Sequence, residues 1–319
     1  MKQKNTVFSL FIIVFVILLI LDPKNNINAC LDGIKLWSTA ILPSLLPFFF
    51  FTSLLSNLGV VQKLGQVLTP ITQRVFKTDG ISGYIYAMSV ISGYPVGAKI
   101  TAELYENGSL RREQACKIST FTSTSGPLFI IGSVGVGMFH SATLGYLILL
   151  CHIIGAFLNG IIYRNIFNTS YIGKTLNNFE KPKTDDHMYN SIKSVLVIGG
   201  YVAIFYVIIT MINNYNILYP FAKFISLIFN CRVSTANTLL GGLIEVTRGC
   251  SDLAKLGITS KQALVLCTGL ISFGGISIIT QAYTFLNKFK MPLKFYICSK
   301  ITQTILSVIV ALIVGNIFL

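Results

Sequence analysis

Long apolar runs, separated by short polar loops, occupy most of this chain. Runs of this kind lie at residues 6–21, 41–61, 114–138, 142–163, 193–212, 262–282 and 295–317. An apolar stretch of about 20 residues is long enough to cross the hydrocarbon core of a bilayer as a helix. The pattern therefore predicts an all-α polytopic membrane protein with about seven crossings, an inside N-terminus and an outside C-terminus.

Two further apolar regions are interrupted too often to form simple spans. The first contains Ser92-Gly93-Tyr94-Pro95-Val96-Gly97-Ala98-Lys99, and the second contains Gly241, Gly242, Glu245 and Arg248. Glycine and proline disfavour a continuous helix, and in lipid a broken helix survives only where protein or a water-filled cavity satisfies the freed backbone groups. We expect one re-entrant hairpin at 82–102, and a second that pairs 217–230 with 236–248.

Two of the predicted spans have unusual centres. The span at 114–138 carries six hydroxyl side chains followed by Gly126 and Pro127, and the span at 262–282 carries the pair Gly274-Gly275. Such a centre is compatible with helix packing through small residues, or with a discontinuous helix. We favour discontinuous helices whose freed backbone groups face a polar substrate.

The two halves of the chain resemble each other. A shift of 148 positions superimposes Gly93 on Gly241, Gln114 on Gln262, Thr120 on Thr268 and Gly126 on Gly274. Three crossings per half give the halves opposite orientations, and such inverted repeats are typical of secondary transporters. The predicted units are an N-terminal span with an interfacial segment at 1–40, a first repeat at 41–163, a cytoplasmic linker at 164–192 and a second repeat at 193–319.

The composition agrees with a membrane protein and narrows the function. Only 11% of the residues are charged, against roughly 25% in soluble domains, and the net charge is +14. The cations are dispersed between the spans, as the positive-inside rule predicts, so we expect no nucleic-acid partner. The cysteines and histidines show no metal spacing, and Walker, His-Glu-x-x-His and Gly-x-Ser-x-Gly motifs are absent. We therefore expect no metal, no cofactor and no enzyme activity.

Three charged residues lie beside the interruptions: Lys99, Glu245 and Arg248. A charge near mid-membrane usually faces the protein interior or a cavity, although long cationic side chains can also reach the interface. If the two cations face the cavity, they and the positive helix ends after Gly97, Pro127 and Gly275 favour a carboxylate substrate. Glu245 is the candidate carrier for a coupling proton, and passive transport is equally compatible with the sequence.

The chain resembles the sporulation integral membrane proteins of the YlbJ family. The resemblance rests on Ser-Gly-Tyr-Pro-Val-Gly-Ala-Lys at 92–99, Ser-Thr-Ser-Gly-Pro at 123–127 and Gly-Gly-Leu-Ile-Glu-Val-Thr-Arg-Gly at 241–249. These stretches are also similar to the gate repeats of nucleoside-transporter-like proteins. The resemblance implies a protein of the outer forespore membrane that moves dipicolinic acid, a small aromatic dicarboxylate, during sporulation. It also implies that hairpin and broken-helix residues touch the substrate.

These observations lead to a specific functional prediction. The predicted substrate-binding residues are Gly93, Tyr94, Pro95, Gly97, Lys99, Thr124, Ser125, Gly126, Glu245, Arg248, Ser272, Gly274 and Gly275. The predicted partners are the lipid bilayer and a small anion, with a homo-oligomer left open. A nucleoside or other small-metabolite transporter is one alternative, and a non-transporting scaffold for spore assembly is another.

Overall fold

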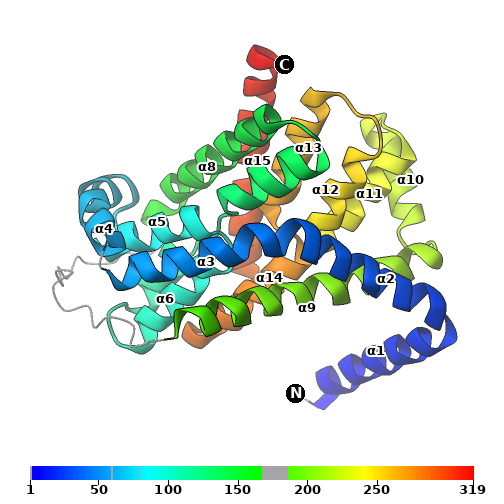
Figure 1. The fold of residues 1–319 in the computed structure, drawn as a ribbon, viewed down its shortest axis with the longest axis horizontal. Helices are drawn as coiled ribbons and strands as arrows, with labels where there is room; N and C mark the ends of the chain where they lie inside the picture. The colour runs from blue at the N-terminus through cyan, green and yellow to red at the C-terminus, as the bar shows by residue number, and fades with distance from the viewer. Residues whose placement is uncertain (1, 59, 79, 167–185) are drawn as a thin grey trace.

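The protein is built from helices, and several of them begin or end at the interruptions that the sequence predicted. The computed structural model describes residues 2–58, 60–78, 80–166 and 186–319, so most of the predicted 164–192 linker lies outside the described residues. The α-helices are α1 (Lys2–Leu21), α2 (Pro23–Leu36), α3 (Leu42–Asn57), α4 (Val60–Ile71), α5 (Ile81–Ser92), α6 (Val96–Glu106), α7 (Arg112–Ile118), α8 (Ala142–Ile162), α9 (His187–Asn214), α10 (Tyr219–Phe229), α11 (Val233–Ile244), α12 (Val246–Ala254), α13 (Ser260–Phe273), α14 (Gly275–Leu286) and α15 (Leu293–Phe318). Wider or tighter helical turns form η1 (Trp37–Ile41), η2 (Thr72–Phe76), η3 (Leu128–Met138), η4 (Tyr163–Asn165) and η6 (Asn287–Phe289). Figure 1 shows these elements as one helical body, with α1 along its edge and the two termini at opposite ends.

Several of these helices are long enough to cross a membrane. Within the described residues, four segments combine sufficient length and hydropathy, at 142–165, 187–214, 260–289 and 293–318. Residues 12–21 and 23–39 meet the same criterion as a pair, with a bend of 103° between them. The other two predicted crossings are shorter, because α3 has 16 residues and the region 114–138 is divided between α7 and η3. The chain is therefore an integral, all-α membrane protein with both long and broken helices.

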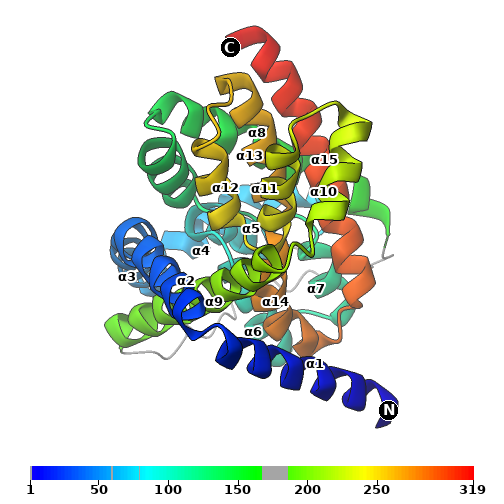
Figure 2. The ribbon, with the colours of Figure 1, turned by 90° about the vertical axis from the view of Figure 1, so that its right-hand side faces the viewer.

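Both predicted hairpins are present, but the second differs from its predicted pairing. The first hairpin (residues 81–106) consists of α5 and α6, which contact each other on either side of a turn at Gly93. The second hairpin (residues 233–254) consists of α11 and α12. The predicted pairing of 217–230 with 236–248 is present as packing of α10 on α11, but α10 is not part of this hairpin. The chain turns at Glu245, which is extended (φ −137°, ψ 112°). Figure 2 shows α10 beside α11 as the preceding helix, outside this hairpin.

The Gly241-Gly242 pair does not form the interruption that the sequence suggested. Both residues lie inside α11. A Cβ on Gly242 would lie 2.6 Å from Leu270 Cδ1 and 3.1 Å from the Cα of Gly249. The missing side chain therefore allows α11 to pack closely on α12 and α13, while the carboxylate of Glu245 allows the chain to turn.

The internal repeat is visible in the helix boundaries. With the shift of 148 positions, the start of α7 coincides with that of α13, and the end of η3 coincides with that of α14. The backbone N–H of Arg111 donates to Gln114 Oε1, and the N–H of Thr259 donates to Gln262 Oε1, each at 3.0 Å. Equivalent glutamines thus begin equivalent helices by the same hydrogen bond.

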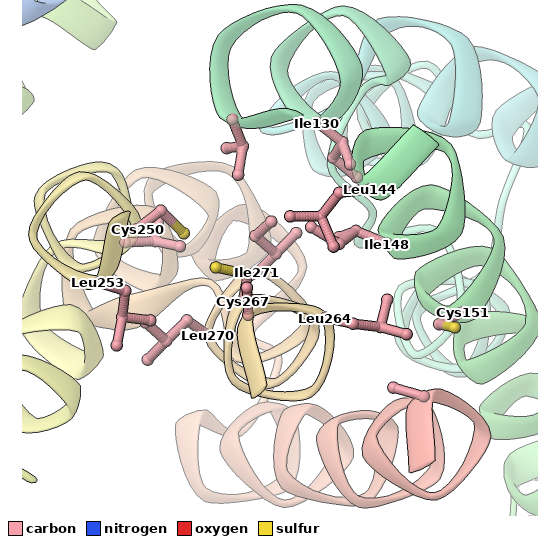
Figure 3. Close-up of a cluster of buried hydrophobic side chains, with 14 of the residues drawn as sticks. Ile130, Leu144, Ile148, Cys151, Cys250, Leu253, Leu264, Cys267, Leu270 and Ile271 are labelled. Atoms are coloured by element: carbon pink, nitrogen blue, oxygen red, sulfur yellow. The ribbon is translucent and has the colours of Figure 1, made fainter. Parts of the chain in front are cut away.

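The largest hydrophobic core joins the two repeats. Figure 3 shows Cys267 and Ile271 of α13 between side chains of α12 and side chains of η3 and α8. Leu264, on the same helix, lies toward α8 and α15, where Ala311 completes the cluster. Elements of both repeats share one packed core, which fixes the two broken helices relative to each other.

Candidate functional site

A narrow cavity lies where both hairpin turns meet both broken helices. Its polar lining consists of Ser92, Tyr94, Ser125, Glu245, Thr247 and Gln281. Apolar side chains of η1, α3, η3, α9, α12 and α14 complete the wall. The cavity offers about 60 Å³, which is well below the roughly 300–1,000 Å³ of ordinary ligand pockets. In this conformation the cavity is therefore too small for a substrate larger than a few water molecules.

Glycine brings the first hairpin onto the first broken helix. Gly93 has φ +75°, a left-handed conformation that side chains rarely adopt, and a Cβ there would overlap the backbone of Gly126. A Cβ on Gly97 would overlap the carbonyl oxygen of Thr122. The predicted binding residues Gly93 and Gly126 therefore meet backbone to backbone at the cavity, whereas Gly97 lies behind them as a packing position.

The hydroxyl-rich segment at 119–127, here called the first break, is a discontinuity in the helix, as predicted. Its backbone groups would be unsatisfied in lipid, and buried side chains of neighbouring helices bind them instead. Three carbonyl oxygens of the break accept hydrogen bonds from side chains: Thr120 O from Asn159 at 2.7 Å, Thr122 O from Ser89 Oγ, and Ser123 O from Lys300 at 3.0 Å. One backbone donor is also bound, because the N–H of Ser125 donates to His152 Nε2 at 2.9 Å. Side chains of α5, α8 and α15 thus stabilise the backbone of this break in one conformation.

His152 connects the two repeats through the first break. It is fully buried, its Nε2 accepts from the Ser125 N–H, and its Nδ1 lies 2.9 Å from Ser272 Oγ. Since Nε2 acts as the acceptor, the hydrogen-bond network assigns the ring proton to Nδ1, which donates to Ser272. The imidazole is neutral in this arrangement and acts as a bridge between α13 and the first break.

Glu245 forms the turn of the second hairpin and faces the cavity. Its Oε1 accepts from the N–H of Thr247 at 3.1 Å, and its Oε2 accepts from the N–H of Arg248 at 2.7 Å. The second break, at Gly274, is followed by Gly275, where a Cβ would lie 3.1 Å from the carbonyl oxygen of Ile244, the residue before Glu245. The carboxylate therefore satisfies the positive N-terminal end of α12, which is closed to any other anion.

The two cations that the sequence placed beside the cavity point elsewhere. The guanidinium of Arg248 donates to Tyr206 O and Thr210 Oγ1, and it pairs with Asp252 at 3.4 Å. It makes no ion pair with Glu245 among the described residues. Lys99 is half exposed, and its Nζ lies 4.0 Å from Glu103 Oε1. Neither residue lines the cavity, so their role in binding an anion stays a prediction without geometric support.

The other predicted residues divide into lining and supporting positions. Tyr94 and Ser125 line the cavity, as do Gly93, Gly126 and Glu245. Pro95 immediately precedes α6, and Gly274 lies near the ring of Tyr94. Thr124 bonds to Ser89 at 2.7 Å, and Ser272 bonds to His152. These supporting residues position the cavity wall, and none of them is among its lining residues.

The polar residues of α8 and α15 were not predicted to be functional, because both helices have the pattern of plain spans. His152 and Asn159 lie seven positions apart on α8 and are fully buried. Tyr296, Lys300, Gln303 and Ser307 recur every three to four positions on α15 and are buried as well. Polar residues at helical spacing mark one inward face of a membrane helix, and this periodicity was the available signal.

A separate, wider cleft of about 820 Å³ lies along some of the same elements. Thr39 and Pro43, Gly132 and Ser133 of η3, and Ser251 and Ala254 of α12 line it. The narrow cavity lies at the beginning of η3 and α12, and the cleft lies further along both helices. No group of three or more His, Cys, Asp or Glu side chains in the described part of the chain is placed to hold a metal ion.

Comparison with known sequences confirms the resemblance that the motifs indicated. A family model described as Gate, nucleoside recognition, matches residues 39–145. The sporulation integral membrane protein YlbJ of Bacillus subtilis (strain 168) is 26% identical over 333 aligned positions, which cover 95% of this chain and 80% of that protein.

Comparison with solved structures confirms the fold class. CNTnw in an inward-facing substrate-bound state matches with a TM-score of 0.58 and 12% identity, over 98% of this chain and 86% of that one. A doubly substituted CNTnw in an outward-facing state matches with the same TM-score, identity and coverage. At such low identity the likeness concerns the fold alone. The chain is therefore an integral membrane protein with the fold of a concentrative nucleoside transporter and a sequence related to a sporulation membrane protein.

Proposed function

We propose that this protein is a secondary transporter that moves dipicolinate across the outer forespore membrane of a spore-forming bacterium. The observation that carries the proposal is the cavity between two hairpin turns and two broken helices, one of each from either repeat. Transporters built from repeats bind their substrates at such junctions. The relation to a sporulation integral membrane protein supports a role in a membrane during sporulation.

Helix ends supply the attraction for an anion in this proposal. Tyr94 and Gly126 line the cavity immediately before the first turns of α6 and η3. The N-terminal end of a helix carries a partial positive charge and free N–H groups, which favour carboxylates. Since Glu245 already satisfies the corresponding end of α12, the carboxylates of dipicolinate fit best on the side of the first repeat.

A nucleoside is the second candidate, and the side chains of the second repeat favour it. Glu245, Thr247 and Gln281 line that side of the cavity and offer carboxylate, hydroxyl and amide groups. Such groups pair with the hydroxyls and base edges of a neutral solute, and they discriminate strongly against solutes that leave them unpaired.

The contrast between cavity and cleft supports alternating access. The cleft of about 820 Å³ lies further along η3 and α12, beside His140 and Lys255, whereas the cavity of about 60 Å³ lies at the beginning of the same helices. Movement of the hairpin turns relative to the broken helices would enlarge the cavity. Rigid repeats rocking around a central site provide such movement in many transporters.

Uptake into liposomes containing the purified protein tests the proposal. Labelled dipicolinate and labelled uridine are offered side by side, with empty liposomes as the blank. We expect saturable dipicolinate uptake that unlabelled dipicolinate suppresses and that Gln281→Leu alters, since Gln281 lines the cavity. Uptake of uridine alone would transfer the assignment to the nucleoside class. Uptake of neither solute by folded protein would favour the scaffold alternative. The same assay with Glu245→Gln tests the predicted proton-carrying role through the pH dependence of uptake.

A further inference from the structure

A buried lysine lies beneath the first hairpin turn. Lys300 of α15 is 1% exposed. Its Nζ donates to the hydroxyl of Tyr94 at 2.5 Å, to the carbonyl oxygen of Ser123 at 3.0 Å and to Gln303 Oε1 at 2.9 Å. The ammonium thus joins three parts of the protein: the turn of the first hairpin, the first break and α15.

The surroundings of Lys300 contain oxygen atoms but no carboxylate partner. The ion pairs of the described residues do not include this lysine. An ammonium carries three protons, and the three oxygen acceptors match that number. The ring of Tyr94 adds a cation–π contact, with Nζ 4.9 Å from its centroid. A buried cation held only by neutral oxygens is costly in a membrane protein, and such residues usually have a function.

The three oxygens around Lys300 are of the kinds that coordinate free cations in other proteins. Unwound backbone carbonyls in the broken helices of transporters coordinate coupling ions. Neutral oxygen ligands from carbonyl, amide and hydroxyl groups suit monovalent and other hard cations. In this chain the carbonyl of Ser123 belongs to such a break, and a covalently attached ammonium already occupies the site.

We propose that Lys300 is a built-in cation that takes the place of a coupling alkali-metal ion. The tethered ammonium neutralises the carbonyl end of the first break and connects it to Tyr94 of the first hairpin. Because the amino group is covalently attached, it needs no alkali-metal ion gradient to occupy the site in each transport cycle. Transport is therefore independent of Na⁺ and K⁺. The transport part of this inference rests on the proposed function, whereas the cation-site part concerns the folded protein alone.

The cation-site part is tested by thermal unfolding of the detergent-purified protein without substrate. The midpoint is measured in NaCl and in choline chloride at equal ionic strength, for the wild type, Lys300→Ala and Lys300→Gln. We expect equal midpoints for the wild type in the two salts. In choline chloride, both variants should have lower unfolding midpoints than the wild type. In NaCl, the midpoint of Lys300→Ala should be several degrees higher than in choline chloride, because Na⁺ enters the vacated oxygen site. Lys261→Ala is the matched control, since Lys261 is an exposed lysine on α13 that bonds Asn316.

Two outcomes contradict the inference. Stabilisation of the wild type by Na⁺ would mean that a free ion binds in addition to the lysine. Equal midpoints of Lys300→Ala in the two salts would assign the lysine a purely structural role. If Lys300→Ala does not fold, Lys300→Gln keeps the test open, because its shorter amide also removes the charge and should show the same direction of Na⁺ effect.

Uptake then tests the consequence for transport. In proteoliposomes, dipicolinate uptake by the wild type should be the same in Na⁺, K⁺ and choline, and uptake by Lys300→Ala should become dependent on Na⁺. Wild-type uptake that requires Na⁺ would overturn the inference. The absence of all uptake would reject the proposed function but leave the result of the unfolding experiment standing.

Discussion

In the first repeat the helix is interrupted all the way from Ile118 to Leu128, whereas in the second the interruption is confined to Gly274. A long interruption frees many backbone groups, and side chains of α5, α8 and α15 bind those of the first break. Two consecutive glycines with positive φ, Gly274 and Gly275, keep the helices on either side almost complete. The comparison explains why four buried side chains bind backbone groups of the first break, where a long stretch of backbone is freed.

The two hairpin turns differ in the charge that stabilises them. Lys300 lies below the first turn and donates to a carbonyl oxygen, while Glu245 forms the second turn and accepts from two N–H groups. Each tethered charge thus meets the backbone end of opposite sign. Lys300 also lies 148 positions after His152, the register of the internal repeat. Equivalent positions of the two repeats both contact the first break, which makes this duplicated structure functionally asymmetric.

The largest effect is expected where equivalent glycines have unequal surroundings. Gly93→Ala should lower the free energy of unfolding by roughly 2–5 kcal/mol, because the residue has positive φ and its Cβ would overlap the backbone of Gly126. Gly241→Ala should change it by about 1 kcal/mol or less, since Gly241 is helical and its nearest atom would be 3.7 Å away. Thermal unfolding of the purified variants measures both.

Gly108→Ala distinguishes the two causes of the expected loss at Gly93, which are the positive φ and the overlap with the backbone of Gly126. Gly108 has φ +76°, almost the value at Gly93, but a Cβ there would have nothing within 4 Å. Its loss of stability should therefore reflect the backbone conformation alone and fall between the other two. Equal losses of stability for Gly93→Ala and Gly241→Ala would contradict the expected difference between the two glycines, and would show that their surroundings are equivalent.

An intermediate effect is expected at His152, which connects the repeats. His152→Leu removes the acceptor of the Ser125 N–H and the donor to Ser272, so we expect a loss of roughly 2–4 kcal/mol from two unsatisfied buried groups. His152→Gln should recover part of this loss, because an amide can still accept and donate.

A control for His152 is available on the neighbouring helix. Ser307 of α15 is buried, and its hydroxyl has no hydrogen-bond partner in the described structure. Ser307→Ala should therefore leave the midpoint of thermal unfolding nearly unchanged. A loss at Ser307 as large as that at His152 would mean that volume, and not the hydrogen bonds of the bridge, determines stability in this region.

The sequence predicted the architecture better than the site, and the reason is physical. Interruptions of apolar runs are local, so glycine, proline and hydroxyl clusters were sufficient to place the first hairpin and the break at 119–127. Likewise Gln114 and Gln262 revealed the repeat, because helix starts depend on neighbouring residues. The second interruption was predicted within 240–249, and the structure places its turn at Glu245. The exact residue was not predictable because a glycine pair is ambiguous: it can end a helix or allow close packing.

The binding chemistry was harder to predict because it depends on which way long side chains point. Lys99 and Arg248 are close in sequence to the turns, yet both side chains point away from the cavity. Lys300 is some 200 positions from Tyr94 and yet bonds to it. Only a packed fold brings α15 beneath the first hairpin, and no local pattern around residue 94 contains that information.

The smallest effect is expected at Lys99, one of the two cations that the sequence placed beside the cavity. Lys99→Gln removes an ion pair of 4.0 Å between side chains that are 43% and 50% exposed, so the stability should change by less than about 0.5 kcal/mol. Uptake of dipicolinate should stay at the wild-type level, because Lys99 does not line the cavity. Lys300→Gln, measured beside it, removes the same charge from a buried site and should reduce both stability and uptake. If Lys99→Gln abolished uptake and Lys300→Gln did not, the substrate would contact the exposed face of α6, and the charge that matters for transport would lie outside the cavity.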